Sequence, residues 1–202
     1  MDKQGKSREN LLDAAEKLFM RKGYGSTTLR DISSALGVSH ASLYYHFPGG
    51  KDALFEAVTE RNVMRHGEGL ARAMAEGGEH LHGRLIGAAT WLLSQPPMDL
   101  IRMAESDMPA LPEAVAIRLM ELIYRNILHP ITVVFESARA AGEVGADTDT
   151  GLVAGAFFGL VESLHATPGM FVKRTKIDMA TELIKIVLRG IHYKEGDRSE
   201  EH

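Results

Sequence analysis

The stretch that decides the fold runs Thr28-Leu-Arg-Asp-Ile-Ser-Ser-Ala-Leu-Gly-Val-Ser-His-Ala-Ser-Leu-Tyr-Tyr-His-Phe47. A helix can begin after Thr28, because Asp31 stands where the acidic residue of a capping box belongs. Gly37 can supply a turn, and Ser39 can cap a second short helix. Two short helices that meet at a glycine turn form a helix-turn-helix, whose second helix enters the major groove of DNA.

The surface of this predicted motif suits a phosphate backbone. A face that approaches DNA must lack acidic groups, and the second helix carries hydroxyl and imidazole side chains instead. Thr28, Ser39 and Lys51 stand at helix starts, where backbone N–H groups favour anions. Small helical bundles that never touch DNA also contain such helix pairs, so core packing is the alternative. The side chains expected on the exposed face of the second helix are Ser39, His40, Ser42, Tyr45 and His46, with Tyr44 beside them.

Helical periodicity continues through the rest of the chain. Pro130 predicts a kink near His129, and Ile131–Phe135 is interpreted as buried helix because no partner strand exists. The charged tail Lys194–His202 is expected to fray. We predict an all-α protein, with a three-helix helix-turn-helix DNA-binding domain at residues 1–50 and a larger helical domain at 51–202, joined by a helix from about residue 51. The later helices are predicted at residues 81–95, 98–107, 113–141, 150–166 and 176–193.

Composition excludes several classes of protein. The chain has 202 residues and no cysteine, which excludes disulfide scaffolds, thiol nucleophiles and thiolate zinc sites. The polar start is unlike a signal peptide, and the longest apolar run is far shorter than the ~18 residues of a membrane span. We therefore expect a soluble, cytoplasmic protein that does not contact a membrane. The net charge of −4 gives no sign of nucleic acid, although residues 1–65 carry 10 Lys and Arg against 8 Asp and Glu.

One segment resembles a known family. The residues that carry the likeness are Leu18-Phe19, Gly23-Tyr24, Thr27–Ile32, Leu36–Ser39, Leu43–Pro48 and Lys51–Leu54. Over about residues 8–58, the chain is similar to the N-terminal domain of TetR-family transcriptional regulators. The resemblance implies an all-helical homodimer that binds a double-stranded DNA operator, most often as a repressor. It also implies release when a small molecule occupies the C-terminal domain.

The resemblance assigns DNA contacts by position. Residues at the second helix touch phosphate, residues on the recognition helix read bases, and residues at its end and at the start of the fourth helix touch phosphate again. His40 replaces the frequent lysine at its position, and Gly49-Gly50 lengthens the following loop by one residue. The predicted DNA-binding residues are Thr28, Arg30, Ser39, His40, Ser42, Tyr44, Tyr45, His46 and Lys51.

The larger domain is expected to dimerise and to bind an effector. Helix 150–166 has small residues at helical spacing, and helix 176–193 is amphipathic, so two copies of the pair could form a four-helix interface. Methionine and aromatic side chains favour an apolar or aromatic effector, with packing in the core as the alternative. These apolar candidates include Met170 and Phe171. The effector-binding candidates are Trp91, Met103, Tyr124, His129, Phe158, Glu162 and His165.

Other functions fit the sequence less well. Gly49-Gly50-Lys51-Asp52 lacks the hydroxyl residue and preceding strand of a phosphate-binding loop. His80 and His82 have no third ligand at metal spacing, so a solvated loop is expected. We predict no enzyme activity, no cofactor and no metal site. The remaining alternative is a helical ligand-binding or interaction protein without specific DNA binding.

Overall fold

The computed structural model describes residues 3–167 and 173–191, with side chains from residue 8 onward. These residues are helical and include no strand, which confirms the predicted all-α fold. Met170, Phe171 and the tail Lys194–His202 lie outside the described residues. The chain folds into two compact units, Met1–Met64 with Asp99–Ile123, and Arg65–Met98 with Tyr124–His202.

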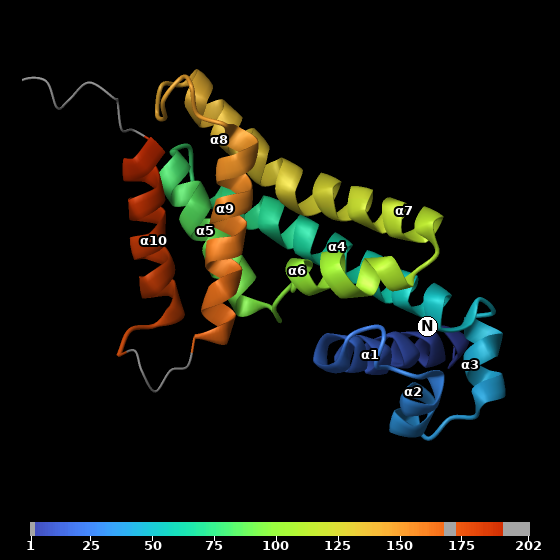
Figure 1. Ribbon diagram of the computed structural model, residues 1–202. Coiled ribbons are helices and arrows are strands. Elements are labelled where there is room, and N and C mark those ends of the chain that lie inside the picture. The colour runs from blue at the N-terminus through green and yellow to red at the C-terminus, as the bar shows by residue number, and fades with distance from the viewer. Residues whose placement is uncertain (1–2, 168–172, 192–202) are drawn as a thin grey trace, which may run out of the picture. The chain divides into compact units, whose positions relative to one another are not determined.

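The first unit begins with a three-helix head (Figure 1). It consists of α1 (Lys3–Lys22), α2 (Leu29–Leu36) and α3 (His40–His46), followed by α4 (Gly50–Glu76), which is the predicted linking helix. Apolar residues three and four positions apart on each helix meet in a shared core, because burial of that face stabilises the short helices. The most buried core residues are Leu11, Leu12, Phe19, Ile32, Leu43, Leu54 and Phe55.

A later stretch of the chain completes the first unit. It comprises α6 (Leu100–Arg102), the π turn η1 (Met103–Asp107), the 3₁₀ turn η2 (Met108–Ala110) and α7 (Glu113–Ile123). The helical stretch predicted for about 98–107 is present, but it begins two residues later, at Leu100, and passes into the π turn at Met103. The Asp99 side chain caps it by accepting the Arg102 N–H at 3.0 Å.

The second unit is built on a tight hairpin of the later part of α4 and α5 (Leu81–Ser94). A Cβ atom on Gly83 would lie 2.1 Å from the carbonyl oxygen of Gly77, so both positions need glycine. The helix α10 (Lys176–Ile191) packs on α5 and on α9 (Thr150–Ser163), and α8 (His129–Ala140) packs on α9.

The predicted irregularity near His129 is a π turn, η3 (Tyr124–Leu128), directly before α8. Pro130 has no N–H and its ring crowds the preceding turn, so the hydrogen-bond ladder widens there. Ile131–Phe135 lies within α8, which confirms that the segment is helical. Ile131, Val134 and Phe135 are buried as predicted, whereas Val133 is 41% exposed on the outer side of the helix.

Candidate nucleic-acid interface

The start of α2 is fixed by reciprocal hydrogen bonds. The Thr28 hydroxyl oxygen accepts the Asp31 N–H at 3.1 Å, and Asp31 Oδ2 accepts the Thr28 N–H at 2.9 Å. Hydrogen bonds from the Thr28 backbone and hydroxyl hold the pKa of Asp31 below its usual value, with a smaller contribution from Lys22. The predicted capping box is therefore present, and it sets the direction in which α2 leaves the turn.

The turn between α2 and α3 is built around Gly37, whose φ is 65°. This left-handed conformation favours glycine, because a side chain there would crowd its own backbone. The Val38 N–H then donates to the carbonyl of Ser33 at 3.0 Å, and Ser33 itself is buried. Ser39 starts α3 by accepting the Ser42 N–H at 3.2 Å.

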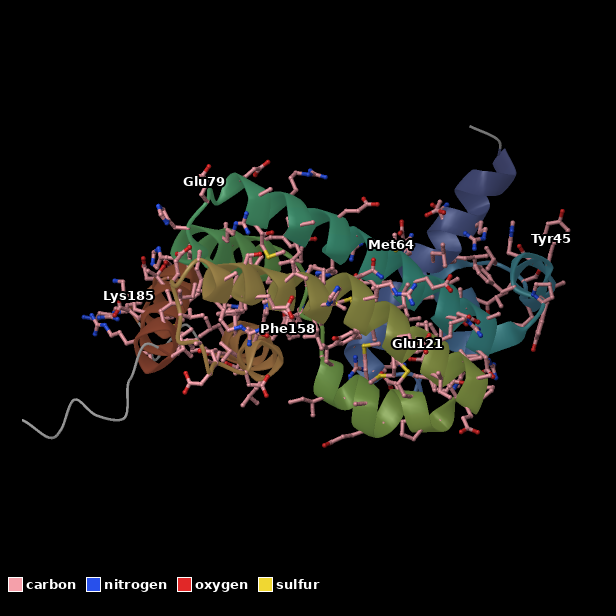
Figure 2. The ribbon with its side chains drawn as sticks, turned by 90° about the horizontal axis from the view of Figure 1, so that it is seen from above. Tyr45, Met64, Glu79, Glu121, Phe158 and Lys185 are labelled. Atoms are coloured by element: carbon pink, nitrogen blue, oxygen red, sulfur yellow. The ribbon has the colours of Figure 1, made fainter. Side chains whose placement is uncertain are left out.

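The helix α3 has one buried side and one exposed side. Leu43 is fully buried against the rest of the head, and Phe47, its C-cap residue, is buried as well. On the outer side His40 is exposed and Tyr45 is 68% exposed. Figure 2 shows Tyr45 at the outer edge of α3. The helix thus presents polar and aromatic side chains to solvent while its other side is locked in the core.

The flanking residues of the predicted interface come from α2 and α4. Thr28 and Arg30 are exposed at the start of α2. Tyr44, half-exposed, has its ring against Gly50, where a Cβ would be 3.6 Å from Tyr44 Cε1. The side chains of Ser42 and His46 are half-buried.

Lys51 is held by contacts that the sequence did not reveal. Its Nζ donates to the carbonyl oxygen of Tyr24 at 3.1 Å and lies 3.9 Å from the centroid of the Tyr24 ring. The Tyr24 hydroxyl in turn donates to Asp52 at 2.5 Å. Burial, and then the Asp52 carboxylate, raise the pKa of Tyr24 well above its ordinary value. The ammonium group of Lys51 has three N–H donors. The Tyr24 carbonyl oxygen accepts one of them, so the group can also donate a hydrogen bond to a phosphate.

A second contact missed by sequence reasoning joins η1 to the turn after α1. Asp107 is buried and its Oδ1 accepts the Tyr24 N–H at 2.9 Å. Arg102 donates to the carbonyl of Phe19 at 2.9 Å, which satisfies one of the last carbonyls of α1. Gly23 has a φ of 78°, and a Cβ atom there would lie 3.1 Å from Arg102 Nη1 and 3.3 Å from Asp107 Oδ1. Residues 83 positions apart in sequence therefore shape the turn that leads into α2.

An ionic cluster joins α1 to α4 in the first unit. Arg61 contacts Glu9 at 3.0 Å, Asp13 at 2.9 Å and Glu16 at 2.6 Å. Glu16 is buried, so its charge requires such a partner. The helix that carries Lys51 is thus tied to the first helix of the head by charge as well as by its apolar core.

The effector-binding candidates fall into separate groups. Glu162 and His165 are close, with Oε1 and Nε2 4.0 Å apart, and both side chains are nearly buried. Glu162 Oε2 accepts the Met98 N–H at 2.8 Å. Burial and then Lys176 lower the pKa of His165, although a hydrogen bond to the Leu92 backbone opposes them. This pair joins the end of α5 to α9.

The other candidates lie around or apart from that pair. Phe158, one turn before Glu162 on α9, is buried. The indole of Trp91 packs where a Cβ on Gly69 would be, and its Nε1 is buried without a hydrogen-bond partner. Tyr124 and His129 are exposed and stack on each other at 5.9 Å. Met103 belongs to the first unit, in η1.

The described residues contain no cluster of three or more His, Asp or Glu side chains that could hold a metal ion. None of the helices in the same described part of the chain is long and apolar enough to cross a membrane.

Comparison with known proteins gives the same assignment as the geometry. Residues 11–58 match the model of the bacterial regulatory proteins of the tetR family. The HTH-type transcriptional regulator LmrA of Bacillus subtilis is 53% identical over 57 residues, which is 28% of this chain and 30% of LmrA. IcaR of Staphylococcus aureus, a negative transcriptional regulator of the biofilm operon icaADBC, is 41% identical over 51 residues, 25% of this chain and 27% of IcaR.

The likeness of fold extends over nearly the whole chain. A tetR-family regulatory protein from Rhodococcus RHA1 superposes with a TM-score of 0.71 at 19% identity, covering 96% of this chain and 100% of that one. Residues 11–58 therefore belong to the DNA-binding domain of the TetR family, and the fold of nearly the whole chain is similar to that of a TetR-family regulator. The TetR family consists of transcriptional regulators and not of enzymes. The part of this chain that matches the family model, residues 11–58, contains all the predicted DNA-binding residues. The matches to LmrA and IcaR each cover less than a third of the length of that relative.

Proposed function

We propose that the protein is a transcriptional repressor that binds a palindromic DNA operator as a homodimer and releases it when a small apolar or aromatic effector binds. One observation carries the DNA-binding part of this proposal. A helix capped at both ends, α3, has its inner side locked by Leu43 and presents His40 and Tyr45 to solvent. No acidic residue occurs between Ile32 and Lys51, so nothing on this stretch repels a phosphate backbone.

Exposed apolar residues on α9 and α10 support dimerisation. Leu152 on α9 is 70% exposed and Ile186 on α10 is 64% exposed. One and two helical turns after Leu152 on α9, Gly155 and Gly159 have open space where a Cβ atom would stand. Adjacent helices with apolar and small residues on their outer faces suit close packing against another helix pair. A second copy of α9 and α10 is the partner that the proposal requires, because a palindromic site is read by a two-fold symmetric dimer.

The Glu162–His165 pair supports an effector site in the second unit. Two buried apolar residues lie close to the pair in the chain or by contact: Phe158, one helical turn before Glu162, and Met98, whose N–H donates to Glu162. A mostly apolar environment with few polar groups is typical of small-molecule sites between helices. We assign the polar ends of the effector to Glu162 and His165, and its apolar body to the side of Phe158 and Trp91.

The relatives support the direction of regulation. IcaR is a negative regulator, and it is 41% identical to this chain over 51 residues. Occlusion of a promoter by a bound dimer is the simplest way for such a protein to act, so we propose repression. Because its target is chromosomal DNA, we place the protein in the cytoplasm.

The DNA-binding part is tested by the salt dependence of affinity for a duplex of random sequence, measured by fluorescence anisotropy. Several phosphate contacts predict a steep linear fall of log K with log salt, by ~0.9 for each contact. Arg30→Ala should reduce that slope, and Arg72→Ala, which removes an exposed arginine in the second unit, should not. Negligible binding even at low salt would contradict the proposal. It would favour a helical ligand-binding or interaction protein without specific DNA binding.

A further inference from the structure

Arg8 lies on α1, yet its side chain reaches the end of α3. Its guanidinium carbon is 5.1 Å from the centroid of the Phe47 ring. Phe47 is the C-cap residue of α3, its N–H donates to the Leu43 carbonyl at 2.9 Å, and its ring is buried. The buried ring is therefore a fixed platform for the Arg8 cation at the C-terminal end of α3.

Part of the Arg8 side chain remains exposed to solvent. A guanidinium that stacks through its face keeps its N–H groups along its edge, and this side chain is 45% exposed. The Glu9 carboxylate is 3.8 Å from Arg8 Nη1, which is too far for a hydrogen bond. Glu9 instead accepts a hydrogen bond from Arg61 at 3.0 Å. Of the contacts described for Arg8, neither uses its hydrogen-bonding capacity.

We propose that Arg8 is a DNA-backbone contact, whose guanidinium, held on Phe47, binds a phosphate next to the C-terminal end of α3. Tyr45 and His46 lie at that same end with their rings 5.2 Å apart. Arginine suits this task, because its planar fork pairs with two phosphate oxygens while its face stacks on an aromatic ring. The inference rests on the proposed DNA binding and adds a contact from α1 to those of α2, α3 and α4.

The test compares Arg8→Ala with Arg21→Ala, which removes an exposed arginine further along the same helix. Binding to a fluorescent random-sequence duplex is measured at salt concentrations from about 0.05 to 0.3 M, which gives the slope of log K against log salt. Arg8→Ala should lower the slope of log K against log salt by ~0.9 and weaken binding at ~0.15 M salt about fivefold. Arg8→Lys should keep the slope, since it keeps the charge. Arg21→Ala should match the unsubstituted protein in both slope and affinity.

A second experiment locates the contact. Single methylphosphonates, which are neutral, are placed at successive positions of a duplex that the protein binds. The unsubstituted protein should lose affinity at each contacted phosphate, and Arg8→Ala should become insensitive at one of them while Arg21→Ala stays sensitive at all.

Three results separate the possible failures. If the unsubstituted protein does not bind the duplex, the proposed function fails and this inference fails with it. If it binds and Arg8→Ala has the same slope and affinity, only the inference is overturned. A weaker affinity with an unchanged slope and an unchanged methylphosphonate pattern would also overturn it, since Arg8 would then act only on the stability of the head.

Discussion

The contact between Asp107 and Tyr24 makes a quantitative prediction about stability. Asp107 is 2% exposed, and its Oδ1 accepts the N–H of Tyr24, which is 5% exposed. Substitution Asp107→Ala removes a charged acceptor and leaves a buried N–H without a partner. A hydrogen bond to a charged group contributes about 1.5–3 kcal/mol, so we expect a loss of about 2–3 kcal/mol in the free energy of unfolding.

Asp107→Asn should cost less, about 1 kcal/mol, because the amide oxygen can still accept the Tyr24 N–H. The lost charge matters little, since Arg102 is 3.9 Å from the carboxylate and its side chain is 30% exposed. Glu105→Ala is the matched control. Glu105 belongs to the same π turn and is exposed, so its removal should change stability by no more than about 0.5 kcal/mol.

The assay is urea unfolding followed by circular dichroism at constant pH and protein concentration. The account predicts that the three variants rank Asp107→Ala, Asp107→Asn and Glu105→Ala, from the least to the most stable. If Asp107→Ala unfolds at the same urea concentration as Glu105→Ala, the buried hydrogen bond does not hold the turn before α2 and the reasoning is refuted.

Four further outcomes are expected. Thr28→Ala should destabilise the protein by about 1 kcal/mol through loss of the capping box, and Thr28→Ser should restore most of it in the same urea assay. Tyr44→Phe should weaken binding to all DNA sequences alike, whereas His40→Ala should mainly change which sequence is preferred in competition binding; a uniform effect of His40→Ala would remove it from base recognition. Leu152→Lys should convert the proposed dimer to a species of about half the mass in analytical ultracentrifugation, and a monomeric unsubstituted protein would contradict the proposed interface. The pKa of His165 is lowered in the folded protein, so the unfolded chain binds the proton first as pH falls below about 6.5 and stability decreases there. His165→Asn should lose less stability than the unsubstituted protein between pH 7 and pH 5.5, and equal losses would show that His165 does not titrate in this way.

Features that depend on neighbouring residues could be predicted from the sequence. The capping box of Thr28 and Asp31, the turn at Gly37 and the cap at Ser39 each involve residues at most five positions apart. Local hydrogen bonds and a glycine conformation determine them, so the pattern was sufficient. The helical conformation of Ile131–Phe135 was also predictable, because the sequence shows no second strand-like segment to pair with it.

Features that depend on distant residues could not be predicted. The Asp107 carboxylate meets Tyr24 across 83 positions, and Lys51 meets the same residue across 27. Nothing in the spacing of either pair signals contact. The helix predicted from about Met98 begins two residues later because Asp99 caps it, and the Met98 N–H donates instead to Glu162, which is 64 positions away. Periodicity identifies the apolar face of a helix. It does not identify a carboxylate from a distant segment that accepts a hydrogen bond from a backbone N–H group.

The most direct test of DNA recognition is selection of fragments from the source genome by the purified protein at about 0.15 M salt. The account predicts enriched fragments that share an inverted repeat, with half-sites about one helical turn (~34–36 Å) or slightly more apart. The same fragments should lose enrichment with the Tyr45→Ala variant, since Tyr45 is exposed on α3. No enriched sequence from a folded, dimeric protein without effector would contradict the account.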